Sequence, residues 1–261
     1  MGFLDIQCQS FKATVTLNRP EVRNAFNDEV IAELTAAFHE FSAREDVRCI
    51  VLAGNGPAFC AGADLNWMRR MAGYTHKENI ADAAELAEML RVIYRCPKPT
   101  IARVQGDVYA GGMGLVAACD IAVSVDTAQY CLSEVKLGLI PATISPYVIR
   151  ALGEQASRRW FVTAERFGAT EAHRVGFVHE VCGADALDAT VEGIVATLVA
   201  NGPMAARACK RLVQDVAGQP ISAELHAETA RRIADIRASD EGREGVQSFL
   251  GKRQPRWLSD G

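Results

Sequence analysis

Hydrophobic and polar residues alternate along the first part of the chain with two different periods. Short apolar runs rich in β-branched residues predict buried strands at 13–17, 48–52, 100–104 and 121–125. Longer segments with an apolar residue every three or four positions predict helices, most clearly at 27–41 and 75–96. Repeated alternation of strands and helices with short loops predicts an α/β core with parallel strands.

The pattern changes after about residue 184. Strand signals stop there, and helical periodicity continues through four segments: 187–200, 204–216, 221–238 and 242–250. Their apolar stripes need burial, either on the chain's own core or on a neighbouring subunit. The sequence therefore predicts two regions, an α/β core over residues 1–184 and a helical C-terminal region over residues 185–261.

Composition limits the classes of protein. The chain has 261 residues, 49% hydrophobic and 23% charged, which is typical of a globular enzyme. The net charge of −4 argues against a nucleic-acid partner, no apolar run is long enough to predict a membrane span, and the N-terminus lacks a signal-peptide pattern. The eight cysteines include no Cys-x-x-Cys pair, which predicts buried, reduced thiols in a cytoplasmic protein.

Two small-residue turns are the first candidates for chemistry, because each follows a predicted strand and leads into a predicted helix. They are Phe59-Cys60-Ala61-Gly62-Ala63-Asp64 and Ala110-Gly111-Gly112-Met113-Gly114. Such turns expose backbone N–H groups at the positive end of a helix, and two of them can direct two donors at one oxygen. That arrangement is an oxyanion hole. The alternative is that the glycines serve backbone geometry alone.

Glu134 is the candidate for proton transfer. It lies in the mostly apolar run 133–141, directly after the strand-like segment 128–132. A carboxylate in apolar surroundings has a raised pKa, which suits general acid–base work near neutral pH. The alternatives are an ion pair with Lys136 or a cap on the next segment.

Several segments, in order along nearly the whole chain, carry a family resemblance: 17–25, 59–65, 111–114, 119–121, 133–138 and 249–253. They resemble the enoyl-CoA hydratase/isomerase (crotonase) superfamily. Three further segments, 66–68, 141–146 and 163–167, look most like bacterial enzymes assigned as methylglutaconyl-CoA hydratase, of leucine degradation.

The resemblance implies a crotonase-like spiral of ββα units and a C-terminal helical region that builds homotrimers, often paired into hexamers. It implies an acyl-CoA substrate, with coenzyme A as part of that substrate, and no metal or redox cofactor. Catalysis would use the N–H groups of Ala63 and Gly111 on the thioester oxygen, with Glu134 as acid and base. Implied contacts with CoA or the acyl group are Arg23, Ala25, Ala61, Ala63, Asp64, Leu65, Trp67, Gly111, Phe249 and Lys252. Phe249 and Lys252 would reach the CoA of a neighbouring subunit, and Trp67 has core packing as its alternative role.

The chain departs from this family at Gly114. Well-studied hydratases of the family carry two glutamates, one at the position of Gly114 and one at the position of Glu134. A single glutamate at the second position is the pattern of Δ3,Δ2-enoyl-CoA isomerases. Two activities therefore stay open: a 2-enoyl-CoA hydratase, with 3-methylglutaconyl-CoA as one substrate hypothesis, and an isomerase that uses Glu134 alone. A third hypothesis is a non-catalytic acyl-CoA-binding or RNA-binding relative.

Overall fold

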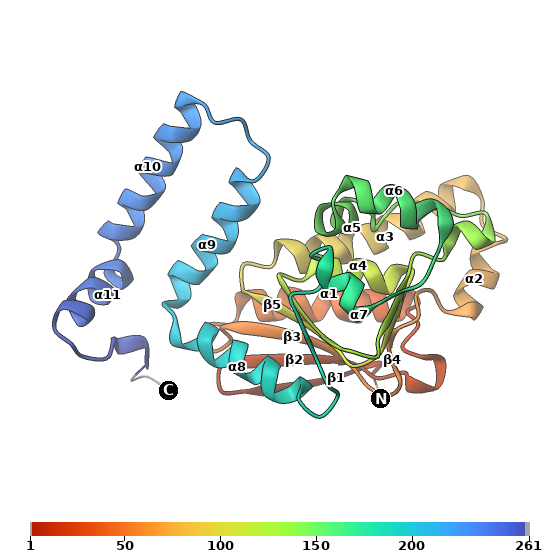
Figure 1. Cartoon of the computed structure of the whole chain (residues 1–261), viewed down its shortest axis with the longest axis horizontal. Coiled ribbons are helices and arrows are strands. Elements are labelled where there is room, and N and C mark those ends of the chain that lie inside the picture. The colour runs from red at the N-terminus through yellow and green to blue at the C-terminus, as the bar shows by residue number, and fades with distance from the viewer. Residues whose placement is uncertain (1, 259–261) are drawn as a thin grey trace.

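A computed structural model describes residues 2–258 as an α/β core and a helical arm (Figure 1). The core contains two sheets, and the larger one has the order β1-β2-β3-β5-β7-β10. Its strands are β1 (Leu4–Gln9), β2 (Lys12–Leu17), β3 (Cys49–Gly54), β5 (Thr100–Val104), β7 (Ile121–Val125) and β10 (Glu180–Cys182). All its pairs are parallel except β1 with β2. The four strands predicted from β-branched runs are therefore confirmed as neighbours in one sheet.

The smaller sheet has the order β4-β6-β8-β9. Its strands are β4 (Ala58–Cys60), β6 (Asp107–Tyr109), β8 (Gln129–Cys131) and β9 (Phe167–Gly168), of which only β9 is antiparallel to its neighbour. Successive strands of the chain alternate between the two sheets: β3 is followed by β4, β5 by β6, and β7 by β8. Helices follow each pair, so the predicted spiral of ββα units is confirmed.

Two long helices begin where their sequences provide caps. In α1 (Asp28–Ala43), the Asn27 side chain accepts a hydrogen bond from the Val30 N–H at 3.0 Å. In α3 (His76–Arg95), Thr75 and Glu78 form a reciprocal capping box. The two helices pack against each other, and the apolar stripe of α1 is buried as its periodicity predicts.

Shorter helices complete the core: α2 (Leu65–Met71), α4 (Gly111–Ala118), α5 (Ser145–Leu152), α6 (Glu154–Thr163) and α7 (Ala169–Arg174), with 3₁₀ turns η1 (Pro20–Val22) and η2 (Glu134–Leu137). Helix α8 (Leu187–Ala200) contacts β3, β5 and β7 and buries Leu187, Val191 and Val195. The first helix of the predicted C-terminal region thus packs on the large sheet. None of the helices in residues 2–258 is long and apolar enough to cross a membrane.

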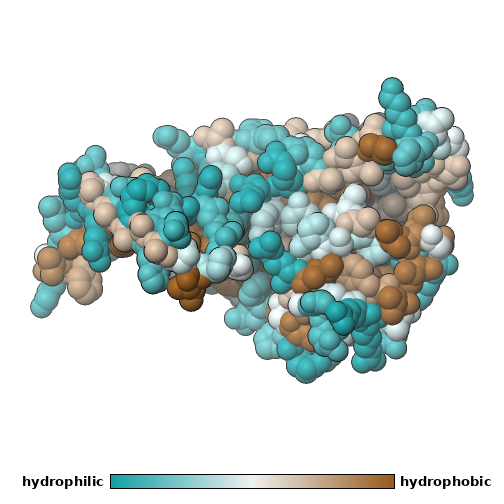
Figure 2. All heavy atoms as spheres, turned by 90° about the horizontal axis from the view of Figure 1, so that it is seen from above, coloured by the Kyte–Doolittle hydropathy of each residue, from teal (hydrophilic) through white to brown (hydrophobic). Residues whose placement is uncertain are grey.

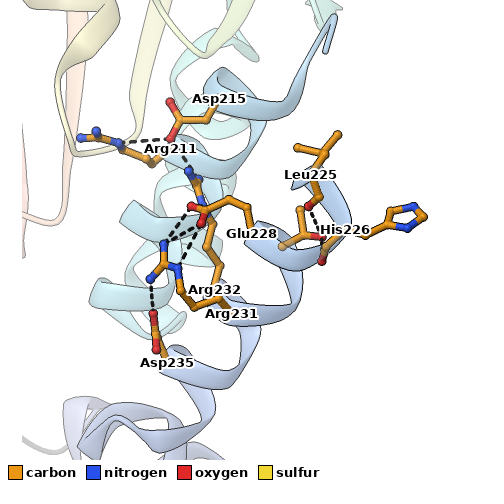
Figure 3. A network of polar contacts seen from close by, with 9 residues as sticks. Arg211, Asp215, Leu225, His226, Glu228, Arg231, Arg232 and Asp235 are labelled. Atoms are coloured by element: carbon orange, nitrogen blue, oxygen red, sulfur yellow. Dashed lines mark hydrogen bonds and ion pairs between the residues drawn. The ribbon is translucent and has the colours of Figure 1, made fainter. Parts of the chain in front are cut away.

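The arm consists of α9 (Pro203–Val216), α10 (Ala223–Ala238) and α11 (Asp240–Leu250), and Figure 1 shows it extending away from the core. Ion pairs join its first two helices (Figure 3). Asp215 on α9 lies 2.9 Å from Arg232 on α10, and Arg232 also lies 2.8 Å from Glu228. Because these side chains stay partly exposed to solvent, we expect the ion pairs to orient the helices more than to stabilise them.

The chain returns to the core after α11 and ends in η3 (Arg256–Leu258). Arg48 donates hydrogen bonds to the carbonyl oxygens of Trp257 at 2.8 Å and Val199 at 3.0 Å. The buried Glu244 carboxylate binds both terminal nitrogens of Arg253, at 2.6 and 2.9 Å. The arm is therefore tethered to the core at both ends.

Cysteine burial differs in part from the prediction. All eight cysteines are free thiols, and Cys49, Cys60, Cys96 and Cys131 are buried as predicted. Cys8 and Cys209 are exposed instead, because Cys8 lies on the outermost strand of the large sheet and Cys209 lies on the arm, where α9 buries no residue.

Candidate active site

Three neighbouring strands of the small sheet end at the candidate site. β4, β6 and β8 run parallel, with β6 between the other two, and the Ala110 N–H donates to the Cys131 carbonyl oxygen at 2.8 Å. Parallel strands end at one edge of their sheet, where ligands bind in many α/β proteins. The segments 61–64, 110–112 and 132–134 therefore leave the sheet at the same edge. These segments contain Ala63, Gly111 and Glu134.

The backbone of Ala63 is held by a one-residue bridge to Phe26. The Phe26 N–H donates to the Gly62 carbonyl oxygen at 2.9 Å, and the Asp64 N–H donates to the Phe26 carbonyl oxygen at 3.0 Å. Successive N–H groups of an extended chain point to opposite sides, so the Ala63 N–H points away from Phe26. Within residues 2–258 it has no hydrogen-bond acceptor.

Gly111 is the first residue of α4, so its N–H has no acceptor inside the helix. The two turns touch: a Cβ atom on Gly62 would lie 3.5 Å from the Gly111 nitrogen and 2.9 Å from the Ala110 Cβ. Gly62 has φ +87° and Ala110 has φ +49°, backbone conformations that residues with a side chain rarely adopt. Two N–H donors without partners in the described chain thus belong to turns in direct contact, as an oxyanion hole requires.

Phe26 supports both turns, a role that the sequence pattern did not predict. A Cβ atom on Gly111 would lie only 2.3 Å from the Phe26 Cζ. The Phe26 ring also packs against Trp67, with ring centroids 6.0 Å apart. Trp67 is buried, and its indole N–H donates to Asp82 at 2.9 Å. The Trp67 side chain therefore packs in the core and links α2 to α3.

Glu134 begins η2, three residues after β8. Burial raises the pKa of its carboxyl group above the usual 4.5. Its Oε2 atom is buried and has no hydrogen-bond partner among the residues that the structure describes, and no ion pair with Lys136 forms there. A buried carboxylate oxygen without a donor is costly to folding, so it indicates a group reserved for a ligand or for catalysis.

Gly114 lies one helical turn after Gly111, and the Ile144 side chain occupies the space beside it. A Cβ atom on Gly114 would lie 2.4 Å from the Ile144 Cγ2 and 3.4 Å from the Leu90 Cδ2. Ile144 is buried. The space in which a side chain at position 114 would begin is therefore already filled by apolar atoms, and a carboxylate cannot enter it without rearrangement.

The other predicted contacts in the core surround the first turn. Ala61 is half-buried and donates its N–H to the Arg23 carbonyl oxygen at 3.0 Å, while the Ala25 carbonyl oxygen accepts from Arg19 at 2.6 Å. Arg23 and Leu65 are exposed.

Asp64 is buried and already bonded. It caps α2 by accepting from the Asn66 N–H at 2.7 Å, and it pairs with Arg19 at 2.9 Å. Hydrogen bonds from Asn66 and Arg19 outweigh burial and lower the pKa of its carboxyl group. The Asp64 backbone is bonded too, since its N–H donates to Phe26 and its carbonyl oxygen accepts from the Met68 N–H at 2.9 Å, so we assign Asp64 to holding the turn.

Phe249 and Lys252 lie on the arm, at and just after the end of α11. Figure 1 places α11 at the opposite end of the molecule from α2 and β4. One chain therefore does not bring these two residues to its own candidate site. Phe249 is 82% exposed, so its ring is free to meet another molecule.

Asn24 is a further structural residue that the sequence pattern did not reveal. It is buried at φ +54°, and its side-chain N–H₂ donates to the carbonyl oxygens of Asn55 at 2.8 Å and Ala58 at 2.9 Å. Its Oδ1 accepts from the Arg19 N–H at 2.9 Å. Asn24 thus joins its own loop to the connection between β3 and β4, and its one advance signal is the tolerance of asparagine for positive φ.

Comparisons with known proteins point to one family. The sequence model of the family described as enoyl-CoA hydratase/isomerase matches residues 9–260. An enoyl-CoA hydratase from Alternaria alternata is 35% identical over 257 residues, which cover 95% of this chain and 82% of that protein. A solved structure of an enoyl-CoA hydratase from Shewanella pealeana has a TM-score of 0.95 at 41% identity and covers 98% of this chain and 96% of its own. Another solved structure, from Legionella pneumophila and provisionally described as an enoyl-CoA hydratase/isomerase (crotonase), has a TM-score of 0.94 at 43% identity. It covers 98% of this chain and 99% of its own.

Proposed function

The chain belongs to the enoyl-CoA hydratase/isomerase family, and from that premise we propose that it adds water across the 2,3 double bond of a 2-enoyl-CoA. The observation that carries this proposal is the buried, unpartnered oxygen of Glu134 at the sheet edge where two free backbone N–H groups meet. The names of the relatives support hydration over other reactions of the family. No cofactor beyond the CoA of the substrate is needed for the steps below.

In the proposed reaction, the N–H groups of Ala63 and Gly111 bind the thioester oxygen. The Glu134 carboxylate takes one proton from water while the water oxygen bonds to C3. The electron pair of the double bond moves toward the thioester, which becomes an enolate stabilised by the two amides. Glu134 then returns its proton to C2, so one water molecule is added and the carboxylate is restored.

The contact between Gly114 and Ile144 favours a second candidate, a Δ3,Δ2-enoyl-CoA isomerase. Ile144 fills the space where a carboxylate at position 114 would begin, so Glu134 has no glutamate partner at that position to share the proton transfers. Isomerisation needs only one: Glu134 would take a proton from C2 and return it to C4 through the same enolate, or the reverse.

The two activities differ in the light absorption of the conjugated thioester. Hydration of a 2-enoyl-CoA removes this absorbance, whereas isomerisation of a 3-enoyl-CoA creates it. Glu134→Gln should lower either activity about 10²–10⁴-fold, since it removes the acid–base group. Glu154→Gln, on the exposed surface of α6, is the matched control and should keep the native rate. Native turnover by Glu134→Gln would disprove both mechanisms.

For the substrate, we propose 3-methylglutaconyl-CoA, because segments 66–68, 141–146 and 163–167 resemble those of bacterial enzymes assigned as methylglutaconyl-CoA hydratase. Its terminal carboxylate needs a cation or a hydrogen-bond donor. Arg69, Arg70 and Ser145 are the candidates by sequence, and they bond to Asn66, Asp28 and the Ala142 carbonyl oxygen respectively. A kcat/KM for 3-methylglutaconyl-CoA no higher than for crotonyl-CoA would reject this substrate.

We also propose that the arm builds a homotrimer, alone or paired into a hexamer. Helices α9 and α10 bury no residue in the single chain, although each carries exposed aliphatic side chains such as Val213 and Ile233. A neighbouring arm or core is the natural cover for them. Light scattering after gel filtration should give three or six times the chain mass, and a monomer would reject the proposal.

A further inference from the structure

A cavity of about 680 Å³ lies between the C-terminal half of α3 and helix α9. Its charged lining consists of five basic side chains, Arg91, Arg95, Arg207, Lys210 and Arg211, and one acidic side chain, Asp215. None of the lining residues belongs to the segments 61–64, 110–114 or 132–134. The volume lies within the range of small-molecule sites. Positive charge is therefore concentrated in one concave place on a chain whose net charge is −4.

The acidic groups near the cavity balance this charge only in part: Arg91 lies 2.6 Å from Glu88, and Lys210 lies 2.7 Å from Asp120. Asp215 is shared by three arginines, Arg232 at 2.9 Å, Arg211 at 3.4 Å and Arg95 at 3.9 Å (Figure 3 shows the first two). Arg207 is half-buried and makes no ion pair or hydrogen bond with any residue in the described part of the chain. The cavity thus holds at least one guanidinium with all its donors available.

The positive charge near the cavity also affects the pKa of a neighbouring lysine, Lys98. Lys98 is fully buried, and its ammonium donates to the carbonyl oxygens of Phe41 and Arg44. Burial, followed by the charge of Arg207, lowers the pKa of Lys98 to about 8.

We propose that this cavity binds a small molecule carrying a phosphate or diphosphate group, at a site separate from the Ala63 and Gly111 amides. Planar guanidinium groups match phosphate oxygens through paired hydrogen bonds, and several cations around one cavity favour a ligand with more than one negative charge. A low-dielectric cavity wall focuses that attraction. A bound anion would bridge α3 of the core and α9 of the arm, which the ion pair of Arg95 with Asp215 already links at 3.9 Å.

Inorganic pyrophosphate is the probe, titrated calorimetrically into the full-length protein at constant ionic strength. We expect binding to the native protein, and an affinity about 10–100-fold weaker in Arg207→Gln, the effect of losing one charged hydrogen-bonding partner. Arg95→Gln tests the opposite wall of the same cavity if Arg207→Gln does not fold. Arg158→Gln is the control, because this exposed arginine lies on α6.

Coenzyme A carries its own diphosphate, so the titration is repeated with saturating CoA. Unchanged pyrophosphate binding supports a separate site. Displacement by CoA would overturn the proposal, since the cavity would then be part of the substrate site. It would also be overturned if the native protein failed to bind millimolar pyrophosphate, or if both cavity variants bound as tightly as the control. These outcomes do not depend on whether the enzyme hydrates or isomerises.

Discussion

Gly114 and Ile144 compete for one space, so the effects of substitutions at the two positions should not add. A Cβ atom on Gly114 would lie 2.4 Å from the Ile144 Cγ2 and 2.8 Å from the Ile144 Cβ. Carbon atoms in contact lie about 3.5–4.0 Å apart, so Gly114→Ala requires a local shift of roughly 1 Å. Overpacking of this kind lowers the free energy of unfolding by about 1–3 kcal/mol.

The effect of Gly114→Ala on the free energy of unfolding should change sign when Ile144 is replaced by glycine. Ile144→Gly deletes the two atoms that the new methyl group would approach most closely and leaves the Leu90 Cδ2 at 3.4 Å. Gly114 lies inside α4, where alanine is more favourable than glycine by about 1 kcal/mol. We therefore expect Gly114→Ala to destabilise the native protein by about 1–3 kcal/mol and to stabilise the Ile144→Gly protein by up to about 1 kcal/mol. The corresponding coupling energy, the difference between these two effects, is about 1–4 kcal/mol.

Thermal unfolding of the four proteins, followed by circular dichroism at one protein concentration, measures this coupling. Each kcal/mol corresponds to roughly 2–4 °C in Tm for a chain of this size class. Gly193→Ala is the matched control, because Gly193 lies in α8 and its Cβ atom would meet nothing within 4 Å. That variant should be slightly stabilised in both backgrounds. Equal effects of Gly114→Ala with and without Ile144 would refute the steric argument.

Four further results are expected. Glu134→Gln should raise Tm above the native value at pH 8, and the gain in Tm should shrink toward pH 4.5. The reason is that the raised pKa of Glu134 makes its charged carboxylate destabilising only at higher pH. A gain in Tm that does not depend on pH would contradict this. The kcat/KM of the native enzyme should rise with pH through a pKa above 4.5, and a flat pH–rate profile would exclude Glu134 as the base. Gly111→Ala should lower turnover about 10²–10³-fold, since its Cβ would meet Phe26 at 2.3 Å and displace the amide, whereas native turnover would exclude that amide. Hydrogen bonding from Arg253 lowers the pKa of Glu244 to about 2. Protection of residues 251–257 from hydrogen exchange should therefore be full above pH 4.5 and fall as the pH approaches 2. In Glu244→Gln, this protection should be low at every pH.

The long elements of the fold could be predicted because their periodicity extends over enough residues to be recognised. The helix predicted at 27–41 is observed as Asp28–Ala43, and the one predicted at 187–200 is observed as Leu187–Ala200. Most of the small sheet could not be predicted in the same way, although β8 lies inside the strand-like segment 128–132. Strands of two or three residues, such as β6 and β9, carry no measurable alternation, and their pairing joins segments far apart in the chain.

The candidate site shows the same division. The small-residue turns at Ala63 and Gly111 and the carboxylate of Glu134 stand out in the sequence by residue type, although their catalytic roles stay predictions. The supporting parts do not stand out, because Phe26 and Ile144 are ordinary apolar residues in any pattern. Their importance comes from what they touch, which is the backbone of two glycines.

By itself, the sequence determined the α/β alternation and the long helices, and it singled out the small set of residues predicted to bind and protonate a thioester. Those properties depend on local periodicity and on side-chain chemistry. Only the tertiary structure decided that three short parallel strands bring these residues to one edge, that apolar atoms occupy the space beside Gly114, and that basic side chains from α3 and α9 enclose a cavity. Such features arise from contacts between distant segments, and a linear pattern does not specify distances between them.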